Sequence, residues 1–237
     1  MTQSLLYSTE LPINDKIKIY IPTIGDIIDD EDGYYSAISL IVSSPIDFMV
    51  QLDDIGIDFS KINDYELFLL TFAALQKMDT HLLFPDLDLS KFIYAETDTN
   101  PLPVLIDEEN NIIIDRVIHS MIASALRKVN HIEKDKRKPG NEAARKYMLE
   151  RARIKQKRQK NRKQDSQLES LIVAMVNTEQ YKYDFESTKN LTIYQFNECV
   201  RQIVKKVDYE HKMHGVYAGT IDPKGFSQDD LNWLIHK

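Results

Sequence analysis

Apolar residues recur at helical spacing in three stretches of this chain, each of which predicts an amphipathic helix. The first stretch consists of Leu168, Leu171, Ile172, Met175 and Val176. The second consists of Ile193, Phe196, Val200, Ile203, Val204 and Val207. The third follows Asp115 and consists of Ile118, Met121, Ile122, Ala125, Leu126 and Val129. In each stretch the apolar residues fall mainly on one face, which we expect to be buried.

Short polar residues mark the starts of several helices, because each is followed three positions later by an acid or an amide. The pairs are Thr23 with Asp26, Ser44 with Asp47, Asn63 with Glu66, Thr192 with Gln195, and Ser227 with Asp230. Together with Pro45, a favoured first-turn proline, they predict helices over residues 23–30, 34–43, 45–54, 63–78, 192–213 and 226–235. Gly215 then follows the long helix and is expected to end it as the C′ residue.

Few segments alternate in the manner of a strand. Residues 16–21 alternate as KIKIYI and predict a short strand, while residues 104–106 and 112–114 flank a polar stretch and predict a hairpin. The sequence therefore predicts a mainly α protein with a small β component, in the α+β class. We expect a helical bundle-like arrangement with one or two short hairpins and a basic central helix.

The composition sets broad limits on location. Apolar residues make up 43% of the 237 residues, enough for a hydrophobic core. The apolar runs are far shorter than the ~20 residues of a membrane-spanning helix, and the N-terminal residues lack the pattern of a signal peptide. Cys199 is the single cysteine, which fits a reducing compartment and is expected to be a small buried hydrophobe. We therefore expect a cytoplasmic protein that has no contact with membranes.

Charge is sorted along the chain. Residues 127–163 hold 16 of the 30 lysines and arginines and 4 of the 37 acids, a local net charge of +12. Residues 1–126 have a net charge of −16, and residues 164–237 one of −3. Pro139-Gly140 interrupts any helix within the basic region. We predict an acidic N-terminal α+β domain over 1–130, a basic linker or helical arm over 131–163, and a helical C-terminal domain over 164–237.

The basic arm is the main candidate for a binding surface. Its candidate residues are Arg145, Lys146, Arg151, Arg153, Lys155, Lys157, Arg158, Lys160, Arg162 and Lys163. Three interpretations stay open: a solvated helix, a contact with an acidic protein surface, or binding to nucleic acid. The acidic surface is either this chain's own N-terminal part or a neighbouring subunit. Nucleic acid is the least favoured partner, because the whole protein is acidic and the arm offers only Tyr147 for stacking.

Other clusters do not complete a catalytic or metal site. The acidic run 29–32 fails the calcium-loop pattern, and His211 with His214 lacks further ligands. We therefore expect no catalytic residues, no cofactor and no metal, and a protein that is not an enzyme. Near the C-terminus, Tyr217 and Trp233 are expected either to close a core or to dock into a partner as aromatic anchors.

Several motifs resemble those of proteins encoded in the tail-morphogenesis region of long-tailed phages and prophages of Gram-positive bacteria. The C-terminal motifs are TIYQFNECVRQI at 192–203, HGVYAGT at 214–220 and LNWL at 231–234. The others are IYIPTIGDII at 19–28, the pair Tyr34 and Tyr35, and IIIDR at 112–116.

Proteins of this group are often assigned as tail assembly chaperones. The resemblance implies a non-enzymatic protein of the host cell cytoplasm that binds the tape-measure and tail-tube proteins and also associates with itself. A structural component of the virion, at the tail tip or the head–tail joint, is the alternative, and a nucleic-acid-binding regulator is a further one.

Overall fold

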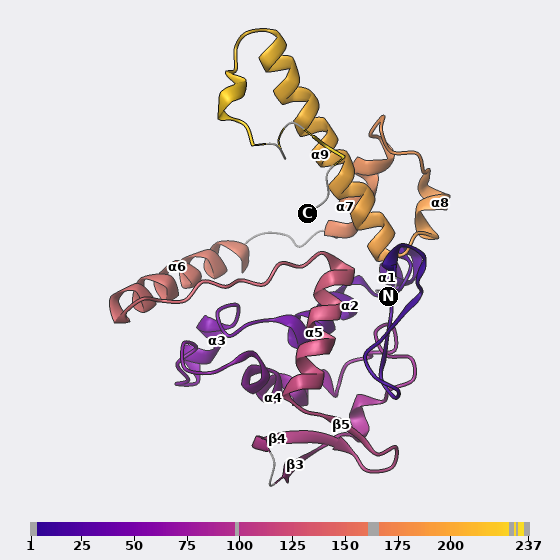
Figure 1. The fold of residues 1–237 in the computed structure, drawn as a ribbon. Helices are drawn as coiled ribbons and strands as arrows, with labels where there is room; N and C mark the ends of the chain where they lie inside the picture. Colours follow the sequence, from indigo (N-terminus) through magenta and orange to yellow (C-terminus); the bar gives the residue numbers. More distant parts are fainter. Residues whose placement is uncertain (1–3, 98–99, 161–165, 228–229, 231, 235–237) are drawn as a thin grey trace.

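The computed structural model describes residues 4–97, 100–160, 166–227, 230 and 232–234 (Figure 1). It is 54% helical and 10% strand, with the strands in two small sheets. The predicted α+β class, with helices predominating, is confirmed. Short 3-10 turns occur at Leu5–Tyr7, Leu89–Lys91 and Pro223–Gly225.

Two of the predicted capping pairs begin helices of the N-terminal half. Helix α1 (Ile24–Asp29) starts after Thr23, whose Oγ1 accepts from the Asp26 N–H at 3.2 Å while the Asp26 carboxylate accepts from the Thr23 N–H at 2.8 Å. The same reciprocal pair, Asn63 with Glu66, begins α4 (Asp64–Leu75). Between them, α2 (Glu31–Val42) is capped by Asp30. The starts of α1 and α4 were predictable because the capping bonds join near neighbours in the sequence, whereas α2 begins three residues before the predicted range of 34–43.

The prediction that Ser44 and Pro45 begin a helix is wrong. Residues 45–48 form turns, and α3 (Met49–Asp54) begins later. Half of the expected box does form, since the Asp47 carboxylate accepts from the Ser44 N–H at 2.7 Å. The Ser44 hydroxyl, however, is buried without a hydrogen-bond partner among the described residues. Without that second bond, the chain continues as turns before the helix starts.

In the described residues the β component is larger than predicted by two strands. Strands β1 (Glu10–Pro12) and β2 (Lys18–Tyr20) form one antiparallel pair. Strand β4 (Asn100–Asp107) pairs with β5 (Ile112–Ile114), as expected for the predicted hairpin, and on its other side with β3 (Ile93–Thr97). The sequence patterns predicted neither β1 nor β3, which lies at the edge of its sheet.

Helix α5 (Arg116–Asn130) lies across the main core and contacts α2, α4, α9 and strands of both sheets (Figure 1). Its predicted apolar face is largely right, because Ile122, Ala125, Leu126 and Val129 are buried. Met121, in contrast, is 43% exposed, and His119 and Ala123 are buried in its place.

Buried polar groups connect α5 to α2. The Tyr34 hydroxyl donates to the Asn130 side-chain oxygen at 2.9 Å, and Nε2 of His119 lies 3.0 Å from the Ile41 carbonyl oxygen. Burial in this apolar setting lowers the pKa of His119 to about 4, although its bond to Ile41 partly opposes the shift. His119 is therefore neutral at pH 7 and donates from Nε2.

The C-terminal helices add to the same hydrophobic cluster. Leu168, Ile172 and Met175 from α7 (Gln167–Val176) and Phe196 from α9 (Ile193–Tyr217) are buried in it, and α8 (Phe185–Lys189) lies against α1. The cluster thus contains residues from both the predicted N-terminal and the predicted C-terminal domain. The division into three domains stays a prediction.

Helix α9 is longer than expected, and Gly215 does not end it. The helix continues to Tyr217, and the positive φ that favours glycine occurs at Gly219 (φ 69°). Gly215 instead lies against Ile221, and a side chain at position 215 would not fit, since its Cβ would come within 2.4 Å of the Ile221 side chain. The outer half of α9 extends away from the core (Figure 1), so that Val204, predicted on the buried face, is 61% exposed.

The predicted helix over 226–235 is absent from the described residues of that range. Ser227 and Asp230 do form their reciprocal backbone bonds, at 3.0 and 3.3 Å. The described residues around them form turns or irregular structure. The Asp230 carboxylate also pairs with Lys212 of α9 at 2.7 Å, so that this segment is attached to the helix.

Candidate partner-binding site

The basic arm contains one helix, α6 (Glu142–Lys160), which lies beside α3 and away from the main core (Figure 1). One face of α6 is attached to the protein through a second, smaller hydrophobic cluster. Met148, Leu149 and Ala152 are partly buried in that cluster. Its buried members are Ile46, Met49, Val50, Leu52, Phe59 and Leu67. No residue of α6 whose side chain is described is fully buried.

Two arginines of α6 pair with acids of the same chain. Arg153 lies between Asp53 and Asp54, with N–O distances of 2.7 and 2.6 Å. Arg145 pairs with Glu142 at 2.7 Å and lies 3.8 Å from Asp58. The chain's own acidic N-terminal part is therefore one partner of the basic arm. Solvent-exposed ion pairs of this kind contribute little to stability, so the apolar contacts supply much of the attachment.

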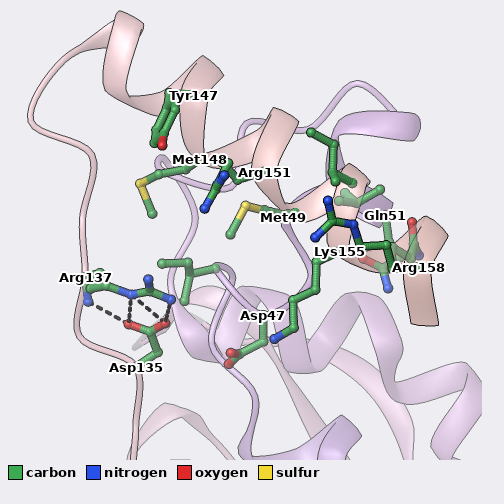
Figure 2. Close-up of a pocket in the computed structure, with 15 residues that line it drawn as sticks. Asp47, Met49, Gln51, Asp135, Arg137, Tyr147, Met148, Arg151, Lys155 and Arg158 are labelled. Atoms are coloured by element: carbon green, nitrogen blue, oxygen red, sulfur yellow. Dashed lines mark hydrogen bonds and ion pairs between the residues drawn. The ribbon is translucent and has the colours of Figure 1, made fainter.

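A different face of α6 borders a cleft, as Figure 2 shows. Its residues are spaced at i, i+4, i+7, i+8 and i+11, which places them on one side of a helix. They are Tyr147, Arg151, Ile154, Lys155 and Arg158. We call this the cleft face of α6.

The opposite wall comes from two other segments. One is the start of α3 with the turn before it, including Asp47, Met49 and Gln51, and the other is the connection from α5 to α6, with Asp135 and Arg137. The cavity between the walls measures about 930 Å³. We refer to it as the α6 cleft.

The charges on the two walls differ. Across from α6, Arg137 donates to Asp135 through Nε at 3.0 Å, and the Asp47 carboxylate is engaged by the Ser44 backbone. Hydrogen bonds from Arg137 lower the pKa of Asp135. On the α6 side, neither Lys155 nor Arg158 has an ion-pair partner in the part of the chain that the structure describes. On the far wall Asp135 and Arg137 therefore balance each other and Asp47 keeps one negative charge, whereas Arg151, Lys155 and Arg158 give the α6 side three positive charges.

Arg151 and the apolar residues complete the α6 side. The guanidinium of Arg151 lies 5.9 Å from the centre of the Tyr147 ring, a cation–π contact that orients it along the helix. Tyr147 and Ile154 are 61% and 48% exposed, and Met148 and Met49 line the cavity beside them. The cleft therefore combines cations with flexible, exposed apolar side chains.

The remaining candidates of the basic arm lie elsewhere. Lys146 and Lys157 are exposed on the outer face of α6, away from the cleft. The side chain of Lys160 and the whole of Arg162 and Lys163 lie outside the described residues. The structure thus separates the predicted cations into an attached face, a cleft face and an outer face.

Tyr217 and Trp233 are not brought together. Tyr217 is 79% exposed at the end of α9. Trp233 packs back on α9, where Gln202 donates to its carbonyl oxygen at 3.0 Å and the Lys206 ammonium lies 5.7 Å from its ring centre. Of the two predicted anchors, only Tyr217 is presented to solvent.

The other clusters have structural contacts. Of the acids at 29–32, Asp30 caps α2, and Glu31 accepts bonds from Ser166 and from the Leu168 N–H at the start of α7. Asp208, beside His211, pairs with Lys212 at 2.6 Å. Among the residues that the structure describes, no group of three or more histidines, cysteines or acids is arranged to hold a metal ion. Likewise, no described helix is long and apolar enough to cross a membrane.

The sequence analysis missed the far wall of the cleft. Asp47 lies within the turn at residues 45–48, where a helix was expected, Met49 begins α3 directly after it, and Asp135 and Arg137 lie in the expected linker. The spacing of the cleft face was visible in the sequence, because Tyr147, Arg151 and Ile154 repeat at helical intervals.

Comparison with protein families finds a match for the C-terminal part of the chain. Residues 157–236 match the model of the YomV second domain. This family is associated with phages and prophages. The matched segment comprises the end of α6, helices α7, α8 and α9, and the segment that folds back on α9. No curated protein and no solved structure matches the chain.

The YomV second-domain match covers about a third of the chain, and most of the α6 cleft precedes it. Of the cleft face, only Arg158 falls within the matched residues. The family match and the cleft are therefore two separate observations. The first is consistent with a phage origin, and the second describes a surface.

Proposed function

We propose that this protein is a non-enzymatic phage morphogenesis factor of the tail assembly chaperone type. In this role it binds other tail proteins, the tape-measure protein and the tail-tube protein, in the host cell cytoplasm. The observation that carries the proposal is the α6 cleft, an open surface with both cations and exposed apolar side chains. The match of residues 157–236 to a phage-associated family supports the setting.

A cleft of this composition suits a protein that holds helical, poorly soluble partners. The partly exposed Met148 side chain can adapt to differently shaped apolar surfaces, and Tyr147 and Ile154 are exposed beside it. The charged side chains at the cleft border limit non-specific association and set the orientation of the bound chain. The large negative charge of the rest of the protein keeps such a complex soluble.

The proposal assigns no reaction to the protein. The carboxylates in the cleft, Asp47 and Asp135, are engaged by the Ser44 backbone and by Arg137. Burial raises the pKa of the half-buried Cys199 thiol, which disfavours the reactive thiolate. The role we propose therefore depends on binding, and it includes association between copies of this chain but neither nucleic acid nor a membrane.

Co-expression tests the proposal. The tape-measure protein encoded in the same phage genome is produced alone and together with this protein, and its soluble fraction is measured. We expect co-expression to increase that fraction several-fold. An unchanged soluble fraction would contradict the proposal.

A second measurement separates a chaperone from a structural component. Peptide mass analysis of purified particles compares the amount of this protein with that of the tail-tube protein. We expect this protein to be absent or present at trace amounts. A fixed stoichiometric amount in every particle would instead establish the structural alternative at the tail tip or the head–tail joint.

A further inference from the structure

We infer that the α6 cleft binds an amphipathic helix of a partner protein that carries acidic side chains along one face. This inference rests on the proposed function and specifies the chemistry of the partner segment. It follows from three observations on the described residues: the direction of the cations on α6, the net positive charge of the cleft lining, and the exposed apolar side chains beside the cations.

The cations on the cleft face form a regular row. Arg151, Lys155 and Arg158 are separated by one turn each and lie on the same side of α6, facing the cleft (Figure 2). The row spans about 10 Å along the helix axis, since each residue advances about 1.5 Å. A second helix packed alongside matches this row when its acids are spaced at i, i+4 and i+7.

The charge balance of the cleft favours an anionic partner. Four cations and two carboxylates line it, which gives a local net charge of +2 in a protein whose net charge is −7. Arg137 and Asp135 neutralise each other across from α6. The remaining excess charge comes from α6, so the attraction is directed to one wall of the cleft.

Apolar groups distinguish this surface from a phosphate-binding one. Ile154 and Tyr147 are exposed beside the cations, and Met49 and Met148 line the cavity between the walls. A nucleic acid would leave the aliphatic side chains without a matching surface, whereas the apolar face of a helix covers them. We therefore infer an acidic protein helix as the occupant.

Fluorescence anisotropy with designed peptides tests the inference on the full-length protein. The first probe is a labelled helical peptide of about 18 residues with glutamates at i, i+4 and i+7 beside a leucine face. The second has lysines in place of these glutamates, and the third contains the residues of the first in scrambled order. At about 150 mM salt, we expect binding of the first peptide and binding at least about tenfold weaker of the other two.

Charge reversal in the protein provides the matched control. The Arg151→Glu/Lys155→Glu/Arg158→Glu variant is expected to bind the acidic peptide at least about tenfold more weakly and to bind the lysine peptide instead. The Lys136→Glu/Lys146→Glu/Lys157→Glu variant changes the net charge equally but leaves the cleft intact. We expect it to bind the acidic peptide within about threefold of the unmodified protein.

The outcomes separate this inference from the proposed function. Equal binding of the acidic and scrambled peptides, or equal losses in the two variants, would overturn the inference and leave the co-expression result unaffected. Tighter binding of a single-stranded oligonucleotide than of the acidic peptide would also overturn it. Occupation of the cleft by a second copy of this chain would overturn it as well. Light scattering would then show a dimer for the unmodified protein and a monomer for the Arg151→Glu/Lys155→Glu/Arg158→Glu variant.

Discussion

Helices α5 and α6 follow each other in the sequence but differ in how they are held. Helix α5 is surrounded by the main core, with Leu126 and Val129 fully buried and Asn130 bonded to Tyr34. Helix α6 is attached along one side, by a small cluster and by the ion pairs of Arg145 and Arg153. The difference shows that one face of α6 is attached to the protein, partly through ion pairs, while the cations of another face border an open cleft.

The way in which α6 is attached decides which variant tests its role. Deleting residues 134–163 removes the cations together with the partly buried Met148, Leu149 and Ala152. That deletion would expose the apolar cluster beneath α6, and any change in mass could arise from this new surface. Reversing charges on one face of α6 at a time avoids the difficulty.

The largest expected effect is the difference in the free energy of unfolding that is lost when an apolar side chain is shortened in α5 and in α6. Leu126→Ala removes fully buried contacts of α5 and is expected to lower the free energy of unfolding by about 2–5 kcal/mol. Met148→Ala removes partly exposed contacts of α6 and is expected to cost about 1 kcal/mol or less. Urea denaturation of both variants measures this, and equal losses would contradict the difference in attachment.

A second prediction concerns the pH dependence of the core around α5. The pKa of His119 is about 4 in the folded protein and about 6.5 in the unfolded chain, so only the unfolded state gains this proton as the pH falls below about 6.5. Stability from His119 is present above pH 6.5 and lost toward pH 4, amounting to about 2 kcal/mol between pH 7 and pH 5.

The His119→Gln variant isolates this contribution, because glutamine does not titrate. Urea denaturation at pH 7, 6 and 5 is expected to show a flatter pH dependence for the variant than for the unmodified protein. The lowered pKa of His131, which is caused by its burial, acts in the same direction in both proteins. Parallel pH profiles would show that His119 is not held neutral by the core.

The smallest expected effect is local to α6. Asp53→Asn/Asp54→Asn removes the partners of Arg153, and exposed pairs of this kind contribute little to stability. We expect amide hydrogen exchange in residues 142–158 to accelerate about two- to fivefold, while exchange in α5 is unchanged. The control variant, Asp29→Asn/Asp86→Asn, changes the net charge equally at exposed positions. If exchange in residues 142–158 accelerated equally in the control variant, a specific attachment of α6 through Arg153 would be contradicted.

The sequence predicted the parts of the fold that depend on near neighbours. The capping pair of Thr23 and Asp26 and the apolar face of α7 both follow from spacing within one helix. The end of α9 did not follow in this way, because Gly215 is needed where Ile221 packs back on the helix. That contact involves a later segment, which spacing alone does not place.

The candidate site was predictable to a similar extent. The cations of α6 and their helical spacing are visible in the sequence, as is the acidic character of the region that contains Asp53 and Asp54. Which cations are paired internally and which face a cleft depends on how α6 docks on α3. That docking is set by Met148 and Ala152 against a cluster formed by residues about a hundred positions earlier.

The central claim is that the cleft face of α6 binds a partner while the opposite side attaches the helix. The soluble fraction of the co-expressed tape-measure protein tests it most directly, measured with the Arg151→Glu/Lys155→Glu/Arg158→Glu variant and with the Lys136→Glu/Lys146→Glu/Lys157→Glu variant. We predict that the first variant loses most of the solubilising effect and that the second retains it. Retention of the full effect by both variants, or an equal loss in both, would contradict the claim.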